Sequence, residues 1–140
     1  MAQLRAAVAA DRGTIRKLVA TENLDPTSLN WRHFWVAEED GQIVGIAQVK
    51  RLPGVNEFGS LVVVPAYRGR GIAAQLIRTL EAQTGRPLYL TCHVRMRPYY
   101  LRFGFRQIAL REAPPFLALK VGVAQVMRLF GHPIIGMVLE

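Results

Sequence analysis

Hydrophobic and polar positions alternate with two different periods along the chain. Apolar residues recur every three or four positions in four segments, which predicts helices over 11–22, 71–83, 97–103 and 116–130. Shorter apolar and β-branched segments predict seven strands, over 3–7, 34–38, 42–51, 57–64, 87–92, 105–110 and 134–139. We also expect a short helical piece that begins at Asp25–Pro26, because proline suits the first position of a helix.

Residues that start or stop regular structure stand between these segments. Asp11 can cap the first helix, Gly85 can end the second, and Asp40–Gly41 predicts a hairpin turn. The element order predicts one mixed sheet of about seven strands with helices on both faces, an α/β (α+β) fold. A chain of 140 residues suits one domain, so we expect a single domain over 1–140.

The net charge adds a constraint on the partner. Eighteen Lys and Arg against ten Asp and Glu give +8, which favours nucleic acid, a membrane surface or a phosphate-bearing cofactor. The arginines are scattered from Arg5 to Arg128, and no nucleic-acid-binding motif accompanies them. We therefore favour a phosphate-bearing cofactor and keep a nucleic-acid partner as the less favoured alternative.

Cysteine usage and hydropathy bear on the compartment. The single cysteine, Cys92, excludes an internal disulfide, as is typical of a reducing compartment. Charged residues and glycines interrupt the apolar region 116–139, so we expect no membrane span. No apolar stretch near the N-terminus is long enough for the core of a signal peptide, so we expect a cytoplasmic protein. One Cys and three scattered His lack the spacing of metal ligands, so we expect no metal site.

The segment 61–74 carries the clearest chemical signal. A strand-like run ends at Pro65, a basic glycine-rich turn follows over 68–71, and a helical pattern begins at once. The unpaired N–H groups of a helix start, the helix dipole and two arginines favour a bound anion, which indicates a pyrophosphate. The Lys–Ser/Thr pair of a phosphate-binding loop is absent, and no acid stands about 20 residues after the glycines as a dinucleotide fold requires.

At this point the sequence resembles a known family, the GNAT N-acetyltransferases. The turn Arg68-Gly69-Arg70-Gly71-Ile72-Ala73 is similar to the family's Arg/Gln-x-x-Gly-x-Gly/Ala signature at a strand-to-helix turn. About thirty residues later, Tyr99-Tyr100-Leu101-Arg102-Phe103-Gly104-Phe105 resembles the family's Tyr-x-x-x-Gly-Phe. The order and lengths of the segments agree from Leu4 to about Leu110. The last thirty residues match in outline.

The resemblance implies that acetyl-CoA is the cofactor. In the family, the strand before the glycine turn pairs with the pantetheine arm, and those positions are Leu61, Val62 and Val63. The turn and the helix start hold the pyrophosphate, which implies Arg68, Gly69, Arg70, Gly71, Ile72, Ala73 and Ala74. Many members have an asparagine at His93 that contacts the cofactor. His93 replaces that contact, acts as a base, or is a structural or solvent-facing residue.

The same resemblance implies two catalytic roles. Tyr100 stands where the family has the general acid that protonates the leaving thiolate; the alternative is a tyrosine packed under the sheet. Glu57, eleven residues before Arg68, stands where some members have a general base; the alternative is a surface carboxylate paired with an arginine. Cys92 has no acid nearby in sequence to orient a Cys–His pair, which favours direct attack over an acyl-cysteine.

The acceptor is expected to be a primary amine of a small molecule, an amino acid or a peptide or protein. In the family, the segment before the second strand lines the acceptor pocket, which makes Trp31, His33 and Trp35 candidate contacts; strand-spaced aromatics are also typical of a core. The apolar helix 116–130 is expected to cover the acceptor cleft or to form a homodimer interface. A non-catalytic acyl-CoA-binding sensor is the alternative to an enzyme.

Overall fold

A computed structural model describes residues 1–127 and 133–140, and the chain folds into two compact units. The first unit holds residues 1–50 and 59–83, and the second holds residues 51–58 and 84–140. Seven strands and four α-helices make up the described part of the chain. Short 3-10 turns lie at Ala9–Asp11, Trp31–His33, Pro65–Tyr67, Val94–Met96 and Leu110–Glu112.

The first unit is built on the strands β1 (Gln3–Ala6), β2 (Phe34–Glu39), β3 (Gln42–Leu52) and β4 (Val55–Val63), of which β3 and β4 continue into the second unit. β1 and β3 flank β2 in antiparallel fashion, with Leu4 opposite Ala37 and Val36 opposite Ile46. The predicted hairpin turn is confirmed, because Asp40 and Gly41 join β2 to β3 with φ angles of 52° and 76°.

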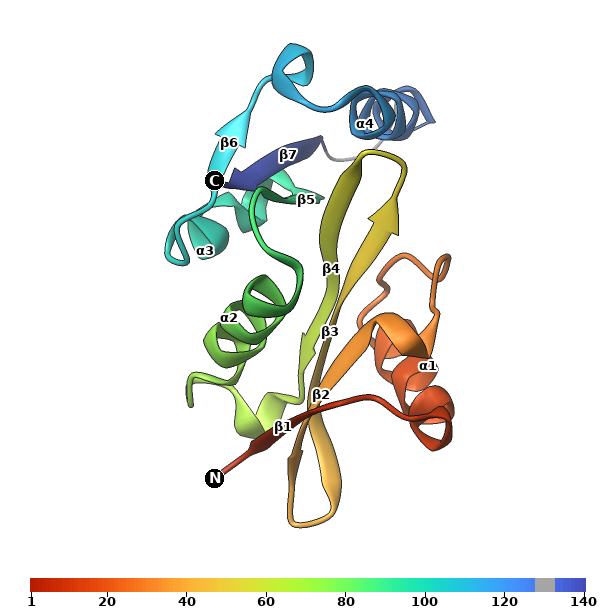
Figure 1. Ribbon diagram of the computed structural model, residues 1–140, viewed down its shortest axis with the longest axis vertical. Helices are drawn as coiled ribbons and strands as arrows, with labels where there is room; N and C mark the ends of the chain where they lie inside the picture. Colours follow the sequence, from red (N-terminus) through yellow and green to blue (C-terminus); the bar gives the residue numbers. More distant parts are fainter. Residues whose placement is uncertain (128–132) are drawn as a thin grey trace. The chain divides into compact units, whose positions relative to one another are not determined.

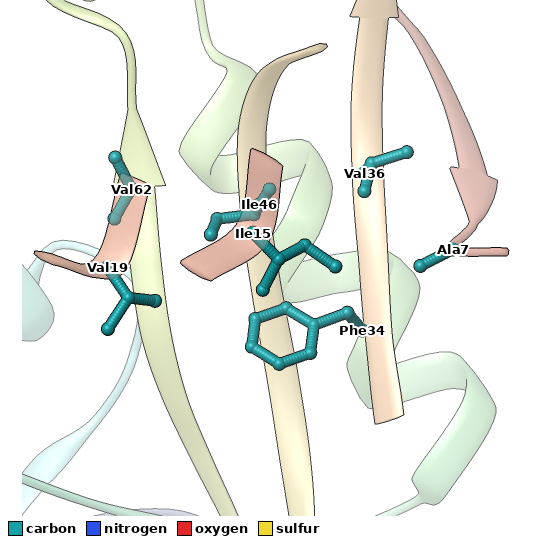
Figure 2. Close-up of a cluster of buried hydrophobic side chains, with 7 residues drawn as sticks. All are labelled: Ala7, Ile15, Val19, Phe34, Val36, Ile46 and Val62. Atoms are coloured by element: carbon teal, nitrogen blue, oxygen red, sulfur yellow. The ribbon is translucent and has the colours of Figure 1, made fainter. Parts of the chain in front are cut away.

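Helix α1 (Arg12–Thr21) covers one face of these strands. Its buried residues Ile15 and Val19 pack with Phe34, Val36, Ile46 and their neighbours in the apolar cluster drawn in Figure 2. The prediction of a helix after Asp11 is confirmed, although the Asp11 carboxylate accepts hydrogen bonds from the Val8 amide and Arg5 rather than from the helix. Burial of this apolar face fixes which side of the sheet α1 occupies.

Helix α2 (Ile72–Thr84) covers the opposite face, as Figure 1 shows. Gly45 in β3 makes the close approach possible: a Cβ atom built there would lie 2.9 Å from Ile72 Cγ2 and 3.3 Å from Leu76 Cδ1. A larger residue at position 45 would therefore push α2 away from the sheet. The expectation of helices on both faces is confirmed in this unit.

The second unit contains β5 (Leu88–His93), β6 (Arg106–Ile108), β7 (Ile134–Leu139), α3 (Arg97–Leu101) and α4 (Pro115–Met127). β5 pairs in parallel with the first part of β4, with Glu57 opposite Tyr89 and Phe58 opposite Leu90. β7 pairs in antiparallel fashion with both β5 and β6. Because parallel and antiparallel pairs coexist, the seven-stranded sheet is mixed, which confirms the predicted fold class.

One expected helix is absent from the structure, and another is described only in part. The helical piece at Asp25–Pro26 is wrong: the Asp25 carboxylate accepts from the Thr27 amide at 2.8 Å, and Ser28 has a φ of 57°, so this segment is an irregular loop. The predicted helix 116–130 is confirmed to Met127, and its last three residues lie outside the described residues.

Candidate active site

The glycine turn between β4 and α2 has the conformation that its sequence predicts. Gly69 and Gly71 have φ angles of 78° and 81°, which L-residues with side chains rarely adopt. No atom lies within 4 Å of a Cβ built at either glycine. These glycines are therefore required for their backbone conformation rather than for lack of space.

The turn leads directly into the first turn of α2. The Gln75 amide donates to the Gly71 carbonyl oxygen at 3.1 Å, so the amides of Ile72, Ala73 and Ala74 precede the helical series of hydrogen bonds. The first turn of the helix carries no acidic residue. Together the amides and the helix dipole form a site suited to a phosphate group.

Arg68 and Arg70 are anchored to the turn itself. Arg68 Nε donates to the Val63 carbonyl oxygen at 2.9 Å, and Arg68 Nη2 forms an ion pair with Glu22 Oε1 at 2.7 Å. Arg70 stacks over the Tyr67 ring at 4.8 Å and lies 3.7 Å from Glu39. Both side chains are more than half exposed, so they remain accessible to an anion that competes with these carboxylates.

A local irregularity in β4 precedes the segment predicted to bind pantetheine. Ser60 has a φ of 54°, and its hydroxyl oxygen accepts from Gln48 Nε2 at 2.8 Å. Leu61, Val62 and Val63 follow at once, and Val62 points into the cluster of Figure 2. No sequence signal distinguishes Ser60, because serine in a strand carries no requirement for a positive φ.

Glu57 lies in β4 of the second unit, and it is not the surface carboxylate that one sequence interpretation allowed. It is 2% exposed. Lys120 of α4 donates to both of its carboxylate oxygens, at 2.7 and 2.8 Å, and Thr91 Oγ1 lies 3.4 Å from one of them. Sequence reasoning missed this partner, although a lone lysine on an apolar helix is a signal that could have found it.

Tyr100 lies on α3 among aromatic rings. Its ring meets those of Tyr99 and Phe105 edge-on, at centroid distances of 5.2 and 5.8 Å. Burial raises the pKa of Tyr100 far above its usual value, and the Cys92 and Tyr99 side chains add to the shift. The phenol therefore keeps its proton at neutral pH, as a general acid must before it acts.

Cys92 and His93 end β5, and neither has the features of a nucleophilic pair. Burial raises the pKa of Cys92 to about 11, so its thiol stays protonated at neutral pH. Its sulfur lies 4.0 Å from the Met137 sulfur. His93 Nδ1 accepts from the Arg95 amide at 3.0 Å and thereby caps the 3-10 turn Val94–Met96.

The three residues predicted to contact an acceptor do not form one strand face. Trp31 and His33 lie in a 3-10 turn, and Trp31 packs against the apolar cluster under α1. Trp35 lies in β2 between Phe34 and Val36, which both belong to that cluster, so its side chain points to the opposite face. The two tryptophans therefore lie on opposite faces of the sheet.

The described residues carry neither a cluster of metal ligands nor a membrane-spanning helix. Residues 1–127 and 133–140 contain no group of three or more His, Cys, Asp or Glu side chains placed to hold a metal ion. Within the same residues, no helix combines the length and the hydropathy needed to cross a membrane.

Known proteins share both the sequence pattern and the fold. The sequence model of the acetyltransferase (GNAT) domain matches residues 30–107, which is more than half of the chain. Mycothiol acetyltransferase from Nocardiopsis dassonvillei is 40% identical over 52 residues, which make up 37% of this chain and 16% of that protein.

Among solved structures, N-acetylglutamate synthase from Neisseria gonorrhoeae, complexed with coenzyme A and N-acetyl-glutamate, has a TM-score of 0.77 at 18% identity; the match covers all of this chain and 35% of that one. Rv2747 from Mycobacterium tuberculosis, in complex with CoA, has a TM-score of 0.74 at 20% identity over 98% of both chains. Diaminobutyrate acetyltransferase from Paenibacillus lautus was solved in complex with its substrate L-2,4-diaminobutyric acid and coenzyme A. It has a TM-score of 0.69 at 18% identity, and the match covers 99% of this chain and 94% of that one. These similarities show the fold, and with the domain match they establish that the chain belongs to the GNAT acetyltransferase family.

Proposed function

We propose that this chain is an N-acetyltransferase that moves an acetyl group from acetyl-CoA to a primary amine by direct attack. The observation that carries the proposal is the turn at Gly69 and Gly71, whose positive φ angles lead into the unpaired amides at the start of α2. Such a turn suits the pyrophosphate of coenzyme A. Family membership and structural neighbours that hold coenzyme A support it.

The cofactor would be held by backbone groups with help from two arginines. The amides from Gly69 to Ala74 would bind the pyrophosphate, and Arg68 and Arg70 would add positive charge beside it. Leu61, Val62 and Val63 would pair with the pantetheine arm through their backbone, and His93 would lie near the cofactor as its family position implies. Glu22 and Glu39 would then give up part of their contact with the arginines.

The reaction would proceed without a covalent enzyme intermediate. The lone pair of the amine attacks the thioester carbonyl carbon, the tetrahedral intermediate collapses, and the carbon–sulfur bond breaks. Tyr100 would give its proton to the departing thiolate, and the proton lost by the amine would reach solvent through a base. The protonated, half-buried Cys92 thiol supports direct attack rather than an acyl-cysteine.

Glu57 is our candidate for that base, acting through water. Its ion pair with Lys120 supports a second role, the anchoring of α4 to β4, and the two roles make different predictions. Trp31, His33 and Trp35 stay predicted acceptor contacts, with Trp31 and Trp35 on separate faces. A single catalytic domain over 1–140, a cytoplasmic location and a homodimer also stay predictions.

A screen for thiol release tests the proposed function. The purified protein would be incubated with acetyl-CoA and a panel of amines, amino acids and peptides, and free coenzyme A would be measured with a thiol reagent. At least one amine is expected to raise thiol release above the rate of spontaneous hydrolysis. Binding of acetyl-CoA by calorimetry with no turnover on any amine would instead favour the acyl-CoA-binding sensor.

Replacing Gly71 with Ala is expected to weaken acetyl-CoA binding about tenfold. A side chain at a φ of 81° costs about 1–2 kcal/mol, and relief of that strain rotates the amides that would hold the pyrophosphate. Calorimetric titration would measure the change. Gly13→Ala is the matched control, because Gly13 lies in α1 with open space around its Cβ position and no positive φ. Equal affinities of the two variants would contradict the assignment.

A further inference from the structure

Two polar residues interrupt the apolar face of β3 that lies under α1. Ile46 belongs to the cluster in Figure 2, and Gln48 and Lys50 follow it at alternate positions, so all three share one face of the strand. Gln48 lies opposite Phe34, another member of the cluster. The proposed reaction uses neither residue, and no short-range sequence pattern explains them.

Lys50 is buried with a weakly held partner. It is 5% exposed, and burial of a lysine ammonium is costly unless a carboxylate pairs with it closely. Its Nζ lies 3.4 Å from Asp25 Oδ2, in the irregular loop between α1 and β2. The Asp25 side chain is 44% exposed, and its other oxygen accepts from Thr27 at 2.6 Å. The contact to Lys50 is thus long, and the Asp25 carboxylate that makes it also bonds to Thr27 in its own loop.

Gln48 presents an unused hydrogen-bond acceptor. Its side chain has no exposed surface, and its Nε2 donates to Ser60 Oγ at 2.8 Å. Its Oε1 has no hydrogen-bond partner among the residues that the structure describes. Such an acceptor costs free energy unless a ligand or a water molecule supplies an N–H or O–H group.

Both side chains lie against the part of β4 that precedes the predicted pantetheine-binding segment. The Lys50 stem passes over Gly59, with Cε 4.0 Å from the position of a Cβ there. Ser60 follows Gly59 in the chain and accepts a hydrogen bond from Gln48, and Leu61 comes directly after it. A ligand on Lys50 and Gln48 would therefore sit beside the strand residues next to the cofactor arm.

We propose that Lys50 and Gln48 bind an acceptor that carries both an amine and a carboxylate, with the carboxylate on the Lys50 ammonium and an N–H of the amine on Gln48 Oε1. This inference rests on the proposed function and names its substrate class as amino-acid-like. The acceptor carboxylate takes the place of Asp25 on Lys50, and the loop between α1 and β2 that carries Asp25 moves aside to admit it. Lys50 gains a close partner and Gln48 a donor, so the acceptor satisfies both buried groups.

Matched pairs of acceptors test the proposal on the unmodified protein. Each pair consists of an amino acid and its carboxamide, which keeps the amine and removes the negative charge. We expect kcat/KM to be about 10- to 100-fold higher for the acids, as a charge-assisted hydrogen bond predicts. Acetylation of acids and carboxamides with equal efficiency would overturn the carboxylate site while leaving the acetyltransferase intact. Acetylation of neither set would overturn the amino-acid-like acceptor, and the proposed function would fall with it only if no amine in the thiol-release screen were acetylated.

Three variants test whether Lys50 causes the preference for acids over carboxamides. Lys50→Met is expected to bring the acid-to-carboxamide ratio of kcat/KM close to one, whereas Lys17→Met, which removes an exposed lysine of α1, should keep the ratio of the parent protein. Asp25→Asn removes the competing carboxylate, so the KM for the acids should fall while that for the carboxamides changes less. A higher KM for the acids in Asp25→Asn would show that the Lys50 contact is only structural. The Asp25→Asn result can be interpreted even if the Lys50→Met variant does not fold.

Discussion

Replacing Lys120 with Met is expected to lower the free energy of unfolding by about 3 kcal/mol. Lys120 donates to both oxygens of Glu57 at 2.7 and 2.8 Å, and Glu57 is 2% exposed. Removal of one partner from a buried ion pair leaves an uncompensated charge, which typically costs about 3–5 kcal/mol. The Lys120 side chain is one-third exposed, which places the expected loss at the lower end of this range.

Urea unfolding would measure the effect, with Lys17→Met as the control for loss of an exposed lysine. The double variant Glu57→Gln/Lys120→Met should recover part of the stability, because it removes both charges together. Midpoints that coincide for Lys120→Met and Lys17→Met would mean that the pair contributes nothing to the fold.

The same variants separate the two roles of Glu57. If Glu57 is the base, Glu57→Gln lowers kcat strongly at a temperature where the variant stays folded. If Glu57 mainly anchors α4, Glu57→Gln and Lys120→Met lower stability, and the folded fraction of each keeps its kcat within a few-fold. Leu117 and Val121 pack α4 against Val55 in either case, so the helix retains an apolar attachment.

Replacing Tyr100 with Phe is expected to lower kcat about 100-fold or more, with a small change in KM for acetyl-CoA. General acid catalysis contributes about 10²–10⁴-fold, and phenylalanine keeps the ring while removing the proton donor. The Tyr100 hydroxyl is protonated across the neutral range, and the burial that raises its pKa makes it a weaker acid than an exposed tyrosine. Steady-state kinetics with an acceptor from the thiol-release screen would provide the measurement.

Tyr99→Phe is the matched control, because it removes a hydroxyl from the adjacent residue of the same helix. The two rings meet edge-on, so both variants keep the aromatic packing. A Tyr100→Phe variant that keeps the kcat of Tyr99→Phe would exclude Tyr100 as the acid. Another group would then have to protonate the thiolate.

Elements that depend on neighbouring residues were predictable. β7 has the predicted bounds, and the turn at Asp40–Gly41 has the positive φ angles that its residues favour. The glycine turn before α2 follows the same logic, since only glycine adopts its φ angles without strain. The segment at Asp25–Pro26 failed because the Asp25 side chain bonds to Thr27 in a turn, which competes with the helix that proline allows.

The amino-acid sequence by itself determined the glycine turn before α2 and the order of strands and helices, except for the helical piece expected at Asp25–Pro26, because these depend on local conformation and hydrophobic period. Only the tertiary structure paired Glu57 with Lys120, placed Trp31 and Trp35 on opposite faces, and buried Lys50 beside Gly59. Glu57 and Lys120 stand 63 positions apart. A charge acquires its partner and its burial from such long-range packing, which the pattern of nearby residues does not encode.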